Sequence, residues 1–385
     1  MRGASMGVLV GSMVSLAATS PAWATDYSQP GPLAVTTGAL GSTEGGSTGG
    51  YVVVPQGSGP YPLIIASHGW SASADQQVGW AQQFASYGFV VVAPSFPSPL
   101  SPNEQTDSTI IETLVTLYSD PTHASPAQGK VDAAHVGLEG HSAGGLATTL
   151  ASAAIHPTAT VLFDPVDSNG DGQKALPSIC NPLLGVFADP SSCNNQEGWW
   201  PYANTTAGDE VLFHVVGSTH CDGENLSRSL CASFCGGAAS TTRQAEYARY
   251  ATAFFLAHLA GDAAAAATLG IGALSADTGV TSVIVKPGVG CGVGAGSDGG
   301  AAAGDAGSGG SGSAGAVPDA SSADARSGGG SSSDGAESGA DDAGVSTTPA
   351  AGDTSNTGTP SSSSGCACRT APARGEEWGW LALAT

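Results

Sequence analysis

The sequence is poor in positive charge. Lys and Arg together number 10 among 385 residues, against 32 Asp and Glu, and the formal net charge is −22. A nucleic-acid partner is excluded on this ground, because neutralising phosphates takes clustered Lys and Arg. We interpret the acidity as a source of solubility outside the cell rather than as a binding feature.

Long apolar runs are also missing, so we expect no integral membrane span. The apolar run near the N-terminus, residues 7–18, is too short to cross a bilayer, and it leads to Ala22-Trp23-Ala24. An A-x-A pattern after Arg2 and an apolar stretch is typical of a secretory signal peptide. We therefore predict a signal peptide over residues 1–24 and an exported protein, extracellular or at the cell surface.

Aromatic residues are absent from residues 288–365, where Gly, Ser, Ala, Asp and Thr predominate. Such a segment buries too little apolar surface to offset the entropy of ordering, so we predict a flexible linker. The expected organisation is then a signal peptide, one catalytic domain over residues 25–287, the linker, and a short tail over residues 366–385.

Eight cysteines are present, and five of them fall between residues 180 and 235. In an exported protein, this cluster favours disulfides over a zinc site. Five is an odd number, so Cys291 or a free thiol has to complete the count, and the pairing stays open.

Apolar runs rich in β-branched residues alternate with helical patterns over residues 26–286. Strands are expected at residues 51–55, 63–67, 89–94, 136–139, 160–163, 183–187 and 211–216, and helices at 75–87, 108–118, 144–155 and 241–259. This order predicts an α/β domain with a mostly parallel sheet and helices on both faces.

A G-x-S-x-G pattern, GHSAG, occupies residues 140–144 between an expected strand and an expected helix. In that context the sharp turn exposes the Ser142 hydroxyl at the carboxyl edge of the sheet, beside the N-terminus of a helix. We predict that Ser142 is a nucleophile.

A serine hydroxyl needs a base within hydrogen-bond reach, and in this architecture the acid and then the histidine follow the serine in the chain. His220 comes just after the strand at residues 211–216 and is the predicted base, whereas His214 lies inside that strand as a core histidine. Asp164 and Asp189 each follow a strand, so the pattern of residues leaves the acid open between them.

Two backbone N–H groups are candidates for holding an oxyanion. One belongs to Ala143, directly after the nucleophile. The other belongs to Trp70, in the loop Ser67–Ser71, where Gly69 lets the backbone turn inward.

No cofactor is expected. Asp167, Asn169 and Asp171 fit the first positions of a D-x-N-x-D-G calcium loop, but the twelfth position is Ser178 rather than Glu. An EF-hand is excluded, and we favour a polar glycine turn, with a structural calcium site as the alternative.

The first half of the chain resembles polyester hydrolases and cutinase-like esterases of the α/β-hydrolase superfamily. The matching pieces are Gly31-Pro32, the HGW loop at 68–70, ASYGFVV at 85–91, and GKVD at 129–132 leading into GHSAGG. This resemblance implies Asp189 as the acid.

The second half resembles chlorophyllases and related lipases, through Asp164-Pro165-Val166-Asp167 and through Thr219-His220-Cys221-Asp222, which clustered cysteines follow. This resemblance implies Asp164, which we favour because DPVD is the longer match and stands directly at a strand end.

The tail resembles the C-terminal sorting tags of myxobacterial surface proteins. Cys366-Ala367-Cys368-Arg369 after a Gly/Ser-rich stalk matches such a tag, whereas the apolar helix is short and the terminal Arg cluster is missing. The resemblance implies attachment to the cell surface through a truncated tag.

These features together predict a monomeric, exported serine carboxylic ester hydrolase that acts on a hydrophobic ester through a Ser-His-Asp triad and an acyl-enzyme. A serine peptidase or acyltransferase on the same fold is the alternative enzyme. A non-catalytic surface binding protein is the alternative outside enzymes.

Overall fold

The computed structural model describes residues 26–194 and 205–291. The predicted signal peptide, nearly all of the predicted linker and the predicted tail lie outside the described residues. Within the described residues, no helix combines the length and the apolar character needed to cross a membrane.

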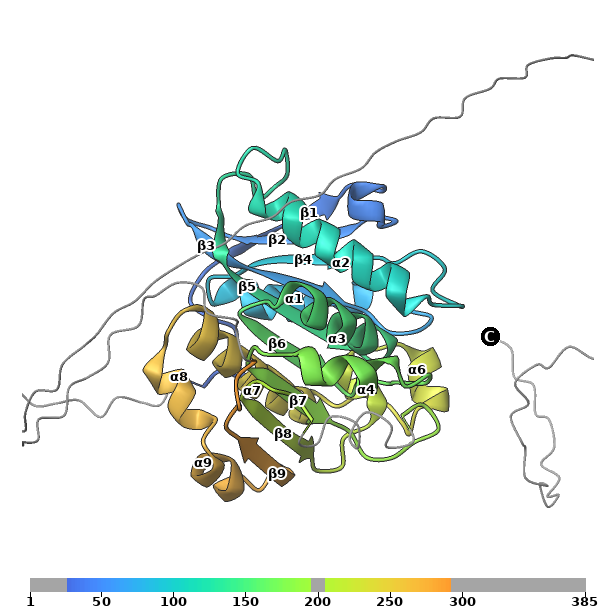
Figure 1. Ribbon diagram of the computed structural model, residues 1–385. Helices are drawn as coiled ribbons and strands as arrows, with labels where there is room; N and C mark the ends of the chain where they lie inside the picture. The colour runs from blue at the N-terminus through green and yellow to red at the C-terminus, as the bar shows by residue number, and fades with distance from the viewer. Residues whose placement is uncertain (1–25, 195–204, 292–385) are drawn as a thin grey trace, which may run out of the picture. The chain divides into compact units, whose positions relative to one another are not determined.

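The described residues form one sheet of nine strands in the order β1-β2-β4-β3-β5-β6-β7-β8-β9 (Figure 1). The strands are β1 (Val35–Leu40), β2 (Gly50–Pro55), β3 (Tyr61–Ser67), β4 (Val90–Pro94), β5 (Val131–His141), β6 (Ala159–Phe163), β7 (Leu183–Phe187), β8 (Glu210–Val215) and β9 (Val280–Lys286). The six strands from β4 to β8 in this order are parallel, whereas β2 and β9 pair antiparallel with their inner neighbours. This is the α/β-hydrolase fold that the sequence predicts.

Helices cover both faces of the sheet (Figure 1). They are α1 (Val78–Ser86), α2 (Glu104–Ser119), α3 (Ala143–Ile155), α4 (Asp171–Ala175), α6 (Ser229–Phe234), α7 (Thr241–Leu259), α8 (Ala263–Thr268) and α9 (Ile271–Ala276), with the 3-10 helices η1 (Glu44–Gly46), η2 (Ala74–Gln76), η3 (Leu176–Ser178) and η4 (His220–Gly223).

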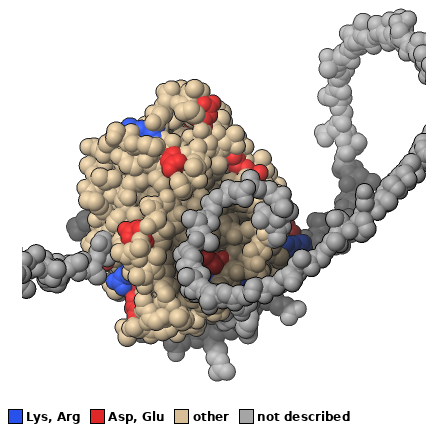
Figure 2. All heavy atoms as spheres, turned by 60° about the vertical axis from the view of Figure 1, so that its left-hand side comes forward, with Lys and Arg blue, Asp and Glu red and all other residues tan. Residues whose placement is uncertain are grey.

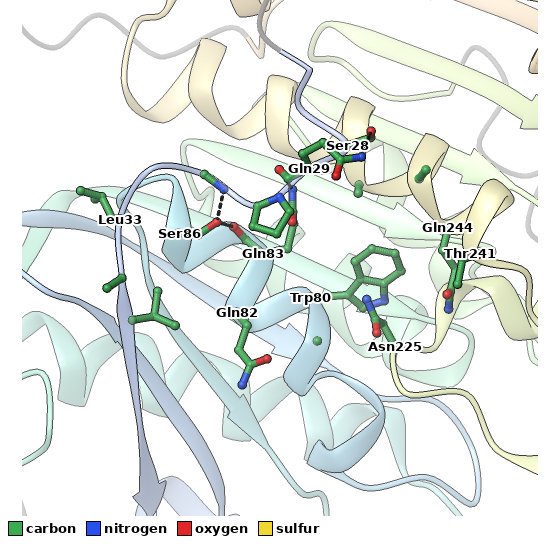
Figure 3. Close-up of a pocket in the computed structure, with 17 residues that line it drawn as sticks. Ser28, Gln29, Leu33, Trp80, Gln82, Gln83, Ser86, Asn225, Thr241 and Gln244 are labelled. Atoms are coloured by element: carbon green, nitrogen blue, oxygen red, sulfur yellow. Dashed lines mark hydrogen bonds between the residues drawn. The ribbon is translucent and has the colours of Figure 1, made fainter.

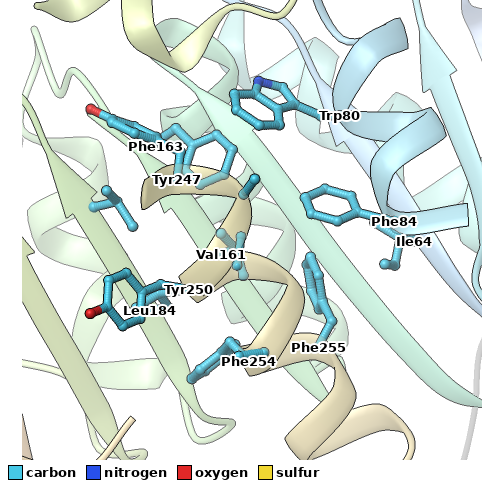
Figure 4. Packing of buried hydrophobic residues seen from close by; sticks show 14 of the residues in the cluster. Ile64, Trp80, Phe84, Val161, Phe163, Leu184, Tyr247, Tyr250, Phe254 and Phe255 are labelled. Carbon is cyan, nitrogen blue, oxygen red and sulfur yellow. The ribbon is translucent and has the colours of Figure 1, made fainter. Parts of the chain in front are cut away.

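The core lies in two layers, one on each side of the sheet. Leu63 and Ile65 of β3 pack in the layer that contains α2 and α3. Ile64, between them, points the other way, toward the aromatic side chains of α1 and α7 (Figure 4). Successive strand residues face opposite sides, so a strand that is apolar throughout is buried on both faces.

Each strand and helix expected from the sequence is present. β7 and α7 have the expected ends, most others differ by a few residues, and the helix expected at residues 75–87 is divided between η2 and α1. The sequence pattern does not reveal β1 and β9, because both are edge strands whose exposed positions break the apolar run. The start of β5 also differs: the strand begins at Val131 rather than near Val136, since its register with β3 shifts between Pro62 and Leu63.

The predicted site residues follow neighbouring parallel strands. Ser142 follows β5, Asp164 follows β6, Asp189 follows β7 and His220 follows β8. Because the carboxyl ends of parallel strands meet at one edge of a sheet, these four residues share that edge.

Candidate active site

Ser142 occupies the turn between β5 and α3. Its backbone has φ 56° and ψ −124°, in the positive-φ region that strains a non-glycine residue. Glycines on both sides make the turn fit: a Cβ at Gly140 would lie 2.3 Å from Thr148 Oγ1, and one at Gly144 would lie 2.3 Å from His68 O. The backbone therefore has the strand, turn and helix that the sequence predicts around this serine.

His220 is the first residue of η4, which follows β8. Its Nε2 lies 2.9 Å from Ser142 Oγ, and the residue is buried. The buried Asp222 carboxylate fixes the turn, because it accepts hydrogen bonds from the backbone N–H of Thr219 at 2.7 Å and from Arg243 Nε at 2.6 Å. The structure therefore holds the predicted base within hydrogen-bond reach of the predicted nucleophile.

Asp164 directly follows β6 and faces the other side of the same imidazole, with Oδ2 2.6 Å from His220 Nδ1. An ionised carboxylate only accepts hydrogen bonds, so we assign the proton to Nδ1, which leaves Nε2 to accept from the Ser142 hydroxyl. Among the described residues, His220 has no hydrogen bond to Asp189, whose backbone N–H donates to Ser218 O at 2.9 Å. Of the two candidate acids, the structure brings Asp164 to the histidine.

Two more groups donate to the Asp164 carboxylate. The backbone N–H of Ala188 lies 3.1 Å from Oδ1, and Asn194 Nδ2 lies 2.6 Å from Oδ2. Asn194 stands on a loop 30 positions from Asp164 without any motif around it, so no sequence pattern reveals this contact.

His141 supports the histidine turn from the nucleophile's side. Its Nε2 lies 2.9 Å from the backbone carbonyl of His220, and the two rings are 4.7 Å apart. A carbonyl only accepts, so Nε2 carries the proton; burial lowers the pKa of His141 well below its usual value and keeps the ring neutral. His141, at the first variable position of G-x-S-x-G, therefore supports the turn that carries His220.

Trp80 supports the same turn from α1. Its indole N–H donates to Gly223 O at 2.8 Å. A Cβ at Gly223 would lie 2.3 Å from His141 Cδ2, so the turn fits only without a side chain there. No sequence pattern reveals the contact between Trp80 and Gly223, since it joins residues 143 positions apart in the chain.

The HGW loop lies against the nucleophile, because a Cβ at Gly69 would lie 2.8 Å from Ser142 Cβ. His68 fixes the loop: its Nε2 accepts from Phe96 N–H at 2.9 Å, and Nδ1–H donates to Gly69 O at 2.9 Å. Burial lowers the pKa of His68 to about 4, so the ring stays neutral and keeps both bonds. Within the described residues, no backbone carbonyl accepts from the N–H of Trp70.

In the possible calcium loop, one side-chain oxygen of each of the three residues has a local partner, whereas Asp167 Oδ1 is buried without a hydrogen bond. Asp167 Oδ2 accepts from Gln173 N–H at 2.8 Å, Asn169 Oδ1 accepts from Asp171 N–H at 3.0 Å, and the Asp171 carboxylate pairs with Lys174 at 2.8 Å. These bonds are those of the polar turn that we favour, and calcium at this loop stays a prediction.

Three disulfides join six cysteines of the described residues: Cys180–Cys291, Cys193–Cys235 and Cys221–Cys231. Cys291 is thus the partner that the odd number of cysteines between residues 180 and 235 requires. Cys221, Cys231 and Cys235 lie close enough together for a metal site, but their sulfurs are in disulfides and are not free thiolates. Two of the three bridges begin next to residues of the site, at Cys221 after His220 and at Cys193 before Asn194.

A cavity of about 710 Å³ lies behind the histidine turn, between the N-terminal segment, α1 and α7 (Figure 3). Trp80 and Asn225 line it, and so do glutamines of α1 and α7. None of Ser142, His220 and Asp164 lines this cavity.

Large apolar side chains are exposed on segments that follow the carboxyl ends of β3, β4 and β8. They are Trp70, Leu100, Leu226, Leu230 and Phe234, each at least 45% exposed. Arg228 joins two of these segments, because its guanidinium donates to the carbonyls of Trp70 and Ser71. Figure 2 shows a different face, on the left-hand side of Figure 1, where charged side chains stand apart among other residues.

The comparisons with known proteins match part of the chain. Residues 38–187 match the model of the Chlorophyllase family. The chain is also similar to Chlorophyllase-2 of Arabidopsis thaliana, with 26% identity over 144 residues that cover 35% of this chain and 45% of the relative. The matched region contains Ser142 and Asp164 and ends before His220, and the chain spans less than half the length of this curated relative. It is the chlorophyllase part of the resemblance that the comparisons support.

Proposed function

We propose that the protein is a serine ester hydrolase in which Ser142 is the nucleophile, His220 the base and Asp164 the acid. The observation that carries the proposal is the chain of hydrogen bonds from Ser142 Oγ through the imidazole of His220 to Asp164 Oδ2, at 2.9 and 2.6 Å. All three residues are at least 93% buried, so little solvent competes for these bonds.

Acylation begins when Ser142 Oγ attacks the carbonyl carbon of the ester while His220 Nε2 takes the hydroxyl proton. The imidazole is then positively charged, and the Asp164 carboxylate stabilises that charge and keeps the ring oriented. When the tetrahedral intermediate collapses, the bond to the alcohol oxygen breaks and His220 gives its proton to the departing alcohol.

Deacylation repeats these steps with water. His220 takes a proton from the water that attacks the acyl carbon, and Ser142 leaves with that proton as the carboxylic acid departs. The N–H groups of Ala143 and Trp70 are the proposed donors to the oxyanion in both halves. Ala143 is the first residue of α3, where N–H groups have no partner within the helix.

We propose a hydrophobic ester as the substrate. The exposed apolar side chains on the segments at the carboxyl edge, among them Trp70 and Phe234, offer apolar contacts around the site. Acidic residues exceed basic ones in the sequence, which disfavours an anionic substrate at long range.

We further propose that the protein is exported and attached to the cell surface by its C-terminal tail, and that it acts as a monomer. The three disulfides fit an oxidising compartment.

The test compares initial rates of the wild-type protein and Ser142→Ala on p-nitrophenyl esters with acyl chains of increasing length. We expect turnover by the wild type and a fall of roughly 10⁴-fold or more in kcat for Ser142→Ala. A rate that rises with acyl length up to a limit would support the hydrophobic substrate. Equal background rates for the two proteins would contradict the proposal.

A further inference from the structure

Asn194 is the polar side chain that shares the acid's oxygen with the base. Its Nδ2 lies 2.6 Å from Asp164 Oδ2, the same atom that lies 2.6 Å from His220 Nδ1. The residue is 2% exposed, so water does not replace this contact. A carboxylate oxygen with two lone pairs can accept both bonds.

The other contacts of Asn194 fix which end of its amide faces the acid. Its Oδ1 accepts from Ser191 N–H at 2.7 Å, a contact that only the oxygen can make. The amide nitrogen therefore faces Asp164, and its second hydrogen is directed to Asp189 O at 3.1 Å. Both hydrogens of Nδ2 have an acceptor.

The segment that carries Asn194 is itself anchored. The adjacent Cys193 is joined to Cys235, at the end of α6, and Ser192 Oγ donates to Phe234 O. α6 follows the histidine turn in the chain, so the covalent link ties the loop after β7 to the segment that follows the base.

We propose that Asn194 is a positioning residue of the reaction: it fixes the Asp164 carboxylate so that Oδ2 points at His220 Nδ1. This inference rests on the proposed function of Ser142, His220 and Asp164. Without the amide, the carboxylate keeps the Ala188 N–H on its other oxygen and gains freedom to rotate about its last torsion. The imidazole would then lose its fixed orientation toward the serine.

Asn194→Asp separates this role from a merely structural one. An aspartate has nearly the same shape and still accepts from Ser191, but it loses the donor to Asp164 and places a second negative charge beside it. In the full chain we expect kcat to fall by roughly 10- to 100-fold with KM nearly unchanged. The added charge favours the protonated imidazole, so the acidic limb of the pH–rate profile moves to higher pH.

Asn181→Asp is the matched control. Asn181 is also buried, and its Nδ2 donates to Thr160 Oγ1 and Pro182 O without touching the site. We expect this variant to lose stability and to keep the pH–rate profile of the wild type. Asn194→Ala, which only removes contacts, serves if Asn194→Asp does not fold, and its kcat should fall about 10-fold.

Ser142→Ala separates failure of the two proposals. If Ser142→Ala is inactive while the folded Asn194 variants keep wild-type kcat and an unmoved acidic limb, the positioning role is overturned and the proposed function stands. If Ser142→Ala is as active as the wild type, the proposed function itself fails.

Discussion

The two sides of the Ser142–His220 hydrogen bond are held in place by different means. On the serine side, the turn between β5 and α3 is shaped by neighbouring residues, since Gly140 and Gly144 leave room for backbone that a Cβ would strike. On the histidine side, η4 is held by side chains from distant elements: His141 from β5, Trp80 from α1 and Arg243 from α7.

The serine turn is recognised from residues close together in the sequence, whereas the histidine turn depends on residues far apart in it. The nucleophile's turn needs a short stretch of sequence, so it leaves a recognisable motif. The turn that carries the base is supported by side chains from β5, α1 and α7, so it depends on contacts between distant parts of the chain. Changes at the glycines that flank Ser142 should therefore act by steric clash, and changes at His141, Trp80 or Arg243 by loss of single hydrogen bonds.

Gly144→Ala should give the largest effect. Its Cβ would meet His68 O at 2.3 Å and Ser67 O at 2.6 Å, both backbone atoms that cannot move without displacing β3. We expect a loss of about 1–3 kcal/mol in the free energy of unfolding and a fall in ester turnover of roughly 100-fold. Urea unfolding and initial rates measure both.

Gly272→Ala is the control for this substitution. Gly272 lies in α9, where an added Cβ would meet no atom within 4 Å, so alanine should raise stability by up to about 1 kcal/mol and leave turnover unchanged. If Gly144→Ala had the same stability and ester turnover as Gly272→Ala, the serine turn would not depend on the absence of a Cβ at residue 144.

His141→Phe tests the hydrogen bond from His141, next to the nucleophile, to the backbone carbonyl of His220. Phenylalanine keeps a planar ring but loses the donor to His220 O, and an unsatisfied buried carbonyl costs about 1–3 kcal/mol. We expect kcat to fall about 10-fold with little change in KM, because the base loses orientation rather than the substrate losing contacts.

His141→Gln offers an amide donor in place of the imidazole and should recover part of the lost kcat. Equal kcat for His141→Phe and the wild type would show that the histidine turn stands without this support.

Asp107→Asn should give the smallest effect on turnover. Asp107 lies in α2, in the core layer that contains α3, and burial raises the pKa of its carboxyl from an ordinary 3.8 to about 7. The folded protein therefore holds a proton that the unfolded chain releases above about pH 4, so wild-type stability declines as pH rises from about 4 to 7. The variant should match the wild type near pH 4 and exceed its stability at pH 8, with unchanged kcat.

Urea unfolding at several pH values measures this slope. A variant whose stability falls with pH as steeply as that of the wild type would show that another group causes the decline.

The sequence predicts the parts of the molecule that have local patterns. Buried strands, the helices between them and Ser142 stand out because periodicity and glycine spacing identify them. The residues that follow parallel strands could be assigned to one sheet edge, which places His220 and narrows the acid to Asp164 or Asp189.

The remaining features depend on contacts that no local pattern records. Asn194 reaches Asp164 across a loop, and the pairing of Cys180 with Cys291 spans 111 positions. The edge strands β1 and β9 carry exposed polar residues, so their pattern is weak until a partner strand is known. Both Asp164 and Asp189 stand at strand ends, so periodicity does not separate them; the DPVD resemblance favours Asp164, and Asp164 is the one whose carboxylate lies against His220.

The Cys180–Cys291 disulfide also determines which strand would carry a force applied to the chain beyond Cys291. A pull on the chain beyond Cys291 would pass through the bridge to the segment before β7, an interior strand paired on both sides. Without it, the load would fall on β9, whose single neighbour is β8, and an edge strand can be peeled away one hydrogen bond at a time. The bridge would therefore shield the β9 edge of the sheet from a pull on the chain beyond Cys291.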